Sequence, residues 1–88
     1  MRRELATDCH AIALNVLAET LTDERRAARF LELTGLSPDG IRARAADPAL
    51  LAACIGFLEA HEPDLISVAG ALELDPAAIA ALRPELER

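Results

Sequence analysis

The order of apolar and polar positions along the chain predicts helices throughout. Apolar residues recur three or four positions apart over most of the sequence, a spacing that places them on one face of a helix. Cap-forming residues, glycines and prolines separate six such stretches. Their expected bounds are 4–19, 23–34, 38–45, 48–61, 63–73 and 76–83. We therefore expect an all-α fold, a compact bundle of five or six short helices forming a single domain over residues 1–88, with ends that fray.

One of the turns is repeated 38 residues later. Residues 30–41 (FLELTGLSPDGI) return in weaker form as residues 68–79 (VAGALELDPAAI). In each copy a leucine closes the first helix, an oxygen-bearing side chain (Ser37 or Asp75) is suited to cap the next one, and a proline follows at its first position. Each copy thus predicts a helix, a tight turn and a second helix, which gives the chain two helix-turn-helix-like units.

The first expected helix has an apolar arc that is wider than one neighbouring helix can cover. Its apolar positions are Leu5, Cys9, Ile12, Ala13, Leu14, Val16, Leu17 and Leu21. Such a helix either lies at the centre of the bundle or presents part of its arc to a partner. Because Leu14, Leu17 and Leu21 widen the arc, we expect them to contact a protein partner or a second copy in a weak homodimer.

The fourth expected helix has two different apolar faces. The main face consists of Leu50, Leu51, Cys54, Ile55, Phe57, Leu58 and His61. A second face carries only small residues, namely Ala49, Ala53, Gly56 and Ala60. Small residues allow another backbone to approach closely. We favour close packing inside the bundle for this second face over a dimer contact.

Composition limits the cellular setting. Half of the 88 residues are apolar, and no apolar run approaches the length of a membrane span. The amino-terminal residues do not have the apolar segment of a signal peptide. Cys9 and Cys54 fall on apolar helix faces, which favours reduced core thiols over a disulfide. These features predict a cytoplasmic protein without a membrane partner.

The net charge of −6 conceals a basic segment, because residues 25–44 hold five arginines against two acids. Residues 30–41 resemble the helix-turn-helix pattern of bacterial regulators, and Arg42 and Arg44 would project from the candidate recognition helix. The arginines that could reach phosphates are Arg25, Arg26 and Arg29. Nucleic-acid binding is therefore the alternative function.

Three features oppose nucleic-acid binding. Leu31 is bulky where the crossing of two such helices usually needs a small residue, Asp47-Pro48 interrupts the second helix, and the whole chain is acidic. We expect the arginines instead to lie apart and to pair with carboxylates such as Glu32, Asp39 or Asp47.

The candidates for chemistry are few. Cys9 with His10 and Cys54 with His61 contain zinc-ligand types, but neither pair has the ligand spacing of a structural zinc site. A thiol nucleophile at Cys54 would have no marked orienting residue and no glycine-rich anion site. The sequence therefore predicts no metal, no cofactor and no catalytic residue.

Three blocks together resemble a family of short alphaproteobacterial proteins known only as a domain of unknown function. The blocks are residues 30–36 (FLELTGL), 42–48 (RARAADP) and 57–62 (FLEAHE), and the resemblance extends over about residues 5 to 82. It implies a compact all-helical cytoplasmic protein without an assigned activity or cofactor. It also implies a partner in bacterial signalling, because members are encoded beside single-domain response regulators. Cys9, His10 and Cys54 do not belong to the family's pattern.

We therefore expect a non-enzymatic protein-protein interaction module or adaptor in bacterial signalling. The alternative is a helix-turn-helix nucleic-acid-binding protein. The candidate interaction face comprises Leu14, Leu17, Leu21, Arg25, Arg29, Arg42 and Arg44.

Overall fold

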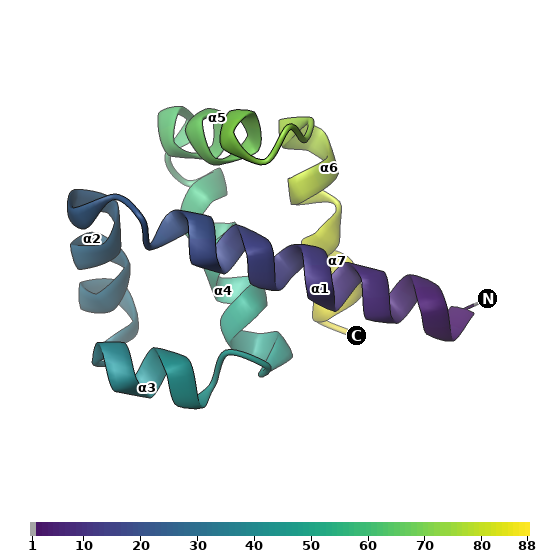
Figure 1. Cartoon of the computed structure of the whole chain (residues 1–88), viewed down its shortest axis with the longest axis horizontal. Helices are drawn as coiled ribbons and strands as arrows, with labels where there is room; N and C mark the ends of the chain where they lie inside the picture. Colours follow the sequence, from purple (N-terminus) through teal and green to yellow (C-terminus); the bar gives the residue numbers. More distant parts are fainter. Residues whose placement is uncertain (1) are drawn as a thin grey trace.

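The computed structural model describes the backbone of residues 2–88 and the side chains of residues 8–88, so the expectation for Leu5 lies outside the described side chains. Over these residues the chain is all-helical and has no strand (Figure 1). The helices are α1 (Arg2–Thr20), α2 (Glu24–Thr34), α3 (Pro38–Ala43), α4 (Pro48–Glu59), α5 (Glu62–Ala71), α6 (Pro76–Ala80) and α7 (Leu82–Leu86). The predicted all-α bundle is confirmed.

Side-chain caps place four helix starts where the sequence predicts them. The carboxylates of Asp23, Asp47 and Asp75 and the hydroxyl of Ser37 each accept a hydrogen bond from a backbone N–H in the following turn, at 2.9–3.0 Å. These bonds satisfy amides that have no partner within the helix. The cap at Asp23 also lowers the pKa of its carboxyl group, chiefly through the bond from the Arg26 amide.

Several helix ends differ by a few residues from the expected bounds, and two of these differences change the description of the fold. The stretch expected as one helix over 76–83 is divided at Ala81 into α6 and α7, and Pro84 lies in the first turn of α7. A proline is tolerated there because the amides of a first turn have no partner within the helix. α4 ends at Glu59, so His61 belongs to the start of α5 and is not part of the apolar face of α4.

The repeated turn has the same backbone conformation in both copies. Gly35 ends α2 with φ of 72°, and Glu73, which occupies the equivalent position after α5, has φ of 55°. Both are left-handed conformations, which glycine adopts at little cost and other residues seldom adopt. Each copy forms a helix, a turn and a second helix, although the second helix is only six residues long in α3 and five in α6.

α1 and α4 pack against each other at the centre of the molecule (Figure 1). α1 also contacts α5 and α7, so several neighbours cover its wide apolar arc. Val16 and Leu17 are buried in the core, at 0% and 2% exposure. The arc of α1 is therefore explained largely by its central position, which was one of the two alternatives drawn from the sequence.

A buried polar network joins the end of α1 to α2 and α4. The guanidinium of Arg26, a residue only 6% exposed, donates to the backbone carbonyls of Thr20 at 2.9 Å and Glu19 at 2.7 Å. The Thr20 hydroxyl donates to the Val16 carbonyl at 2.7 Å and accepts from the Cys54 thiol at 3.4 Å. Arg26 thereby satisfies carbonyls at the carboxyl end of α1, where a positive charge also complements the helix dipole.

Within residues 2–88, no single helix has both the length and the apolar character of a membrane span. Among the described residues, only the segments Glu62–Ala71 and Pro76–Leu86 taken together are as long and as apolar as a membrane span. The two segments are bent by 103° relative to each other.

Candidate functional site

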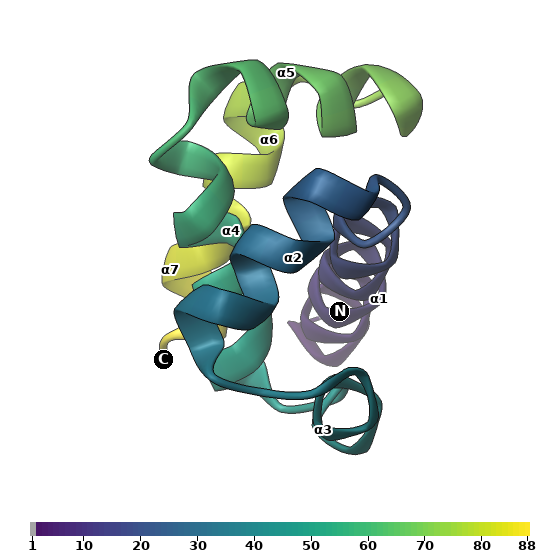
Figure 2. The same cartoon turned by 90° about the vertical axis from the view of Figure 1, so that its left-hand side faces the viewer.

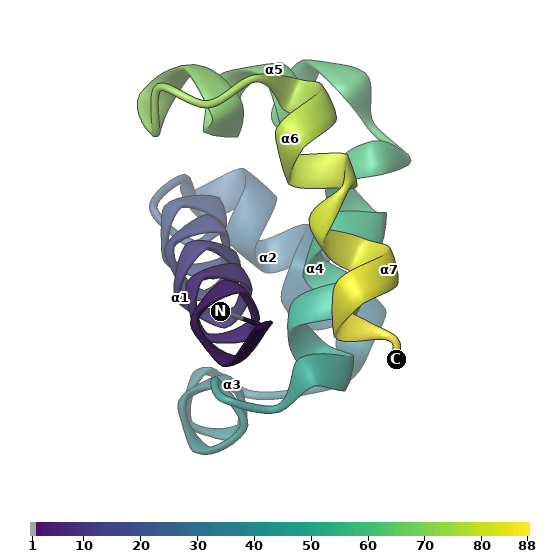
Figure 3. The same cartoon turned by 90° about the vertical axis from the view of Figure 1, so that its right-hand side faces the viewer.

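The face of α4 that points away from α1 is not covered by another helix. Figures 2 and 3 show α1 on one side of α4, with α2 and α7 beside α4. The small residues lie on this open face: Ala49, Ala53 and Ala60 are exposed and Gly56 is half-buried. The expectation that they pack inside the bundle is wrong. α1 covers the larger apolar side of α4, and the short flanking helices do not close over the small one.

Two hollows of about 670 Å³ each run along this face and adjoin at Ala53 and Gly56. We call them together the α4 groove. Its floor is formed by Ala49, Ala53, Gly56 and Ala60, and its walls come from α2 and α7. A Cβ atom added at Gly56 would be in van der Waals contact with the Cδ atom of Arg83, at 3.9 Å, so the Arg83 side chain lies beside the midpoint of the groove.

One end of the groove combines apolar surface with a positive charge. It is lined by Phe57, Ala60 and His61 and by two residues of α2, Arg29 and Leu33. Leu33 is 65% exposed, which is unusual for a leucine that borders an apolar hollow. Asp64 forms an ion pair with Arg29 and lies 3.8 Å from the His61 Nε2, so the positive charge at this end is offset by a carboxylate behind it.

Arg29 is held in place by two contacts. Its guanidinium forms an ion pair with Asp64 and lies 5.4 Å from the centre of the Phe57 ring. Phe57 in turn packs edge-on against buried Phe30, with ring centres 5.3 Å apart. Since an exposed arginine would otherwise sample many rotamers, these contacts fix a cation at the wall of the groove.

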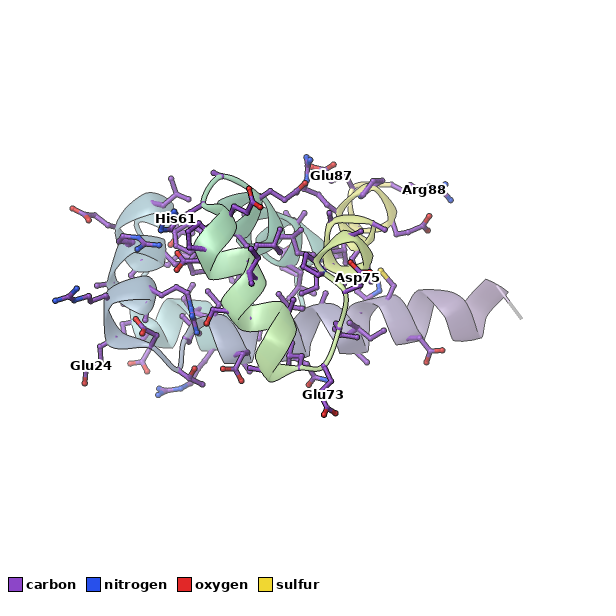
Figure 4. All side chains as sticks on the ribbon, turned by 90° about the horizontal axis from the view of Figure 1, so that it is seen from above. Glu24, His61, Glu73, Asp75, Glu87 and Arg88 are labelled. Atoms are coloured by element: carbon purple, nitrogen blue, oxygen red, sulfur yellow. The ribbon has the colours of Figure 1, made fainter. Side chains whose placement is uncertain are left out.

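The other end of the groove carries an excess of negative charge. Its lining includes Asp47 at the start of α4 and Arg83, Leu86 and Glu87 of α7. The Arg83 Nε donates to the Glu59 carboxylate at 2.6 Å, and this bond raises the pKa of the arginine. Figure 4 shows His61 and Glu87 well apart on the side of the molecule away from α1, so they mark the two ends of the open face.

The interaction face expected from the sequence does not form one surface. Leu17 is in the core and Leu21 is half-buried against it, which leaves Leu14, at 44% exposure, as the open leucine of the three. Of the arginines, Arg29 lines the α4 groove, while Arg25, Arg42 and Arg44 are exposed outside it, on α2 and on or just after α3. Leu17 is buried because α4, α5 and α7 pack against α1. Helical periodicity alone does not show which helices cover a given face.

The arginines of residues 25–44 have different environments. Arg42 pairs with Asp39 at 2.8 Å, as expected, and this pair is highly exposed. Arg29 pairs with Asp64 rather than with a carboxylate near in sequence. Arg26 is buried, which the sequence did not indicate. Arg25 and Arg44 have no ion pair within the described part of the chain.

The cysteines and His61 do not form the sites considered from the sequence. Cys54 is fully buried, whereas the His61 side chain is 49% exposed on another helix, so the two do not share a face. Burial raises the pKa of the Cys54 thiol to about 11, and burial followed by Glu85 raises that of Cys9. A protonated, buried thiol is a poor nucleophile and a poor metal ligand. Among the described residues no cluster of three metal-ligating side chains is present.

Residues 6–88 match the family described as "Protein of unknown function (DUF3572)", and the chain belongs to this family. The resemblance to a domain of unknown function is thereby confirmed over most of the chain. No curated protein and no solved structure matches it.

Proposed function

We propose that this member of the DUF3572 family is a non-enzymatic protein-interaction module whose α4 groove binds a helix of a protein partner. The observation that carries the proposal is the groove itself: a shallow hollow along α4 with small side chains on its floor, apolar beside Phe57 and partly polar beside Asp47, Arg83 and Glu87. A helix laid into such a channel can approach α4 closely and contact both walls.

The character of the polar groups supports binding rather than catalysis. The guanidinium groups in the walls are already engaged by carboxylates, through Arg29 with Asp64 and Arg83 with Glu59. Both thiols are buried outside the groove, with raised pKa values. The groove therefore offers shape and fixed charge but no activated nucleophile. The resemblance noted from the sequence favours an adaptor in bacterial signalling as the setting.

Capture from a bacterial lysate tests the proposal. The bait is the whole chain as wild type and as two variants, Ala53→Arg in the floor of the groove and Ala28→Arg on the exposed side of α2. Both alanines are exposed, so neither substitution disturbs the core. Each capture is carried out with and without nuclease and analysed by mass spectrometry.

The proposal predicts a captured protein that resists nuclease, remains with the Ala28→Arg control and is lost with Ala53→Arg. Capture that is unaffected by Ala53→Arg would contradict the groove as the binding site. Capture that disappears on nuclease treatment, and in an Arg42→Glu, Arg44→Glu variant, would instead support nucleic-acid binding through the basic segment.

A further inference from the structure

We propose that a hollow between α5 and α6 is a second docking site, which takes an apolar side chain from a cationic segment of a partner protein. The hollow measures about 370 Å³ and lies where α5 and α6 meet beside the carboxyl end of α4 (Figure 3). Its apolar lining consists of Leu65, Ile66, Pro76, Ala77 and Ala80, and we call it the α5–α6 hollow. It shares no lining residue with the α4 groove, so this inference goes beyond the proposed function and does not rest on it.

Ile66 gives the α5–α6 hollow an apolar surface that is open to solvent. Val68 and Ala69 are the buried positions of α5, and Leu65 is half-buried against the core. Ile66 stands outside this set and is 53% exposed. A large apolar side chain beside a hollow offers a contact that an apolar side chain of a partner can cover, and such a contact removes both from water.

The charges that line the hollow indicate the chemistry of its occupant. The two remaining lining residues, Glu59 and Glu62, are acids, and no arginine lines the hollow among the described side chains. Glu59 is paired with Arg83 at 2.6 Å. Glu62 is exposed and has no ion pair within the described part of the chain. Its carboxylate can therefore accept hydrogen bonds from a cation of a partner.

The wider surroundings of the hollow are also negative. Residues 59–88 hold seven acids and two arginines, so this segment contributes five of the six net negative charges of the chain. Both arginines are paired with acids of the same segment. Glu73 and Asp75 lie in the turn that joins α5 to α6 (Figure 4) and, like Glu62, have no ion pair among residues 8–88. This potential attracts a segment rich in arginine or lysine and repels phosphates.

The occupant that fits both features is a segment with one large apolar side chain between arginines or lysines. Its apolar side chain enters the hollow and covers Ile66, while its cations reach Glu62 and Asp75. A second copy of the chain is less suitable, because it carries the same net charge of −6.

Fluorescence anisotropy with a synthetic peptide tests the inference. The probe is a dye-labelled, amidated helical peptide of alanine and arginine, with a single leucine at its centre and an arginine one turn away on either side. In two matched peptides, glutamate replaces each arginine or alanine replaces the leucine. We expect the probe to bind the purified chain with a dissociation constant between about 10 μM and 1 mM, because one hollow provides only a small contact. Both matched peptides should bind about fivefold more weakly or worse, since each lacks one of the two contacts.

Three variants that each add one positive charge locate the binding site. Ala77→Arg places a guanidinium in the α5–α6 hollow, Ala53→Arg alters the α4 groove, and Ala28→Arg lies outside both. All three alanines are exposed. Ala77→Arg should weaken binding of the probe by about tenfold or more, and the other two should leave it within about twofold of the wild type. Because the net charge changes equally, a loss confined to Ala77→Arg reflects the site.

A second variant tests the charge of the hollow without adding bulk. Glu62→Gln keeps the shape of the side chain and should weaken binding by about threefold, with a smaller dependence on salt. Glu32→Gln, which removes an exposed carboxylate from α2, is the matched control and should have no effect. Circular dichroism shows whether each variant is folded, and if Ala77→Arg is not, the Glu62→Gln comparison decides.

Binding that survives both Ala77→Arg and Glu62→Gln, or that is equally tight for the peptide without leucine, would overturn the inference. Loss of binding in Ala53→Arg instead would place the cationic segment in the α4 groove and would also overturn it. Self-association of the chain alone that Ala77→Arg abolishes would replace the partner protein by a second copy. Capture from a lysate through the α4 groove is measured separately, so either proposal can fail while the other stands.

Discussion

Arg26 is a buried cation whose guanidinium is bound by carbonyl and hydroxyl oxygens at and just after the carboxyl end of α1 rather than by carboxylates. It donates to the carbonyls of Thr20 and Glu19 and, at 3.4 Å, to the Thr22 hydroxyl. We expect Arg26→Ala to lower the free energy of unfolding by about 2–4 kcal/mol, because it removes buried packing and the donor to the Thr20 carbonyl, whereas the Glu19 carbonyl keeps the N–H and hydroxyl of Thr22 as donors. Arg26→Lys should recover only part of the loss, since an ammonium cannot reproduce the planar fork.

The adjacent Arg25 provides the control for this prediction. It is exposed and has no ion pair within the described residues, so Arg25→Ala should change stability by less than about 0.5 kcal/mol. Urea unfolding followed by far-ultraviolet circular dichroism measures both variants. Equal losses for Arg25→Ala and Arg26→Ala would show that the network around Thr20 does not stabilise the fold.

The thiols make the stability of the chain sensitive to alkaline pH. The chain has no Lys or Tyr, so Cys9 and Cys54 are its only side chains that titrate between about pH 8 and 12. Burial raises the pKa of Cys54 to about 11, above the value of about 8.5 in an unfolded chain. The folded state therefore holds this proton more tightly, and its stabilisation is complete below pH 8.5 and is lost as pH rises through 11.

We expect the free energy of unfolding to fall by about 3 kcal/mol between pH 8.5 and 11, from the shift of about two units at Cys54. Urea unfolding at several pH values across this range measures the change. In Cys54→Ala the fall should be much smaller, with Cys9 responsible for what remains. A slope that is the same in the variant and the wild type would contradict the assignment to Cys54.

Single residues were the least predictable part of the molecule. The core positions of Cys9 and Cys54 followed from helical periodicity, because an apolar residue in the main stripe of a helix is normally buried. Arg26 could not be found in this way. Its position on α2 looks like that of any arginine on a polar face, and only the fold brings the end of α1 within its reach.

At the scale of the helices, the two copies of the repeated turn offer a reciprocal experiment. Gly35→Ala should destabilise the chain by about 1 kcal/mol, although the new Cβ would meet no atom within 4 Å, because φ is 72°. Glu73→Gly should stabilise it by about 0.5–1 kcal/mol, because it relieves the positive φ at the equivalent position.

Gly70 separates this conformational effect from a general effect of glycine. It lies within α5, and a Cβ added there would also meet no atom within 4 Å. Gly70→Ala should therefore stabilise the chain by about 0.5–1 kcal/mol. Thermal unfolding measures all three variants. Destabilisation by Glu73→Gly would show that the left-handed conformation at Glu73 is not a source of strain.

The helices themselves were largely predictable, because their starts depend on local chemistry. A side-chain acceptor followed by proline at the first position identified α3, α4 and α6. For α2 the sequence left Thr22 or Asp23 as the cap, and the structure has Asp23. The division between α6 and α7 was missed, since Pro84 can stand within the first turn of a new helix. The sequence also did not show that the small-residue face of α4 is exposed. Periodicity shows that a helix has a small-residue face, but the neighbour of that face depends on the tertiary arrangement.

For the whole molecule, the bundle leaves one side of its central helix α4 open. α1 occupies the opposite side, α5 and α3 lie at the two ends, and the flanks are α2 and α7 (Figures 1 and 2). Leu17, which was expected on an interaction face of α1, is buried in the core and is not accessible to a partner. The groove unites residues of α2, α4 and α7 that lie up to 58 positions apart, from Arg29 to Glu87, and no local pattern reveals such a combination.

The central claim is that the α4 groove is the surface through which this protein contacts another chain. The most direct test is capture from a bacterial lysate with the wild-type chain and with the Ala53→Arg and Ala28→Arg variants, whose substituted alanines are both exposed. The account predicts a nuclease-resistant protein that is captured by the wild type and by Ala28→Arg and is lost with Ala53→Arg. A protein captured equally well by Ala53→Arg would contradict the claim.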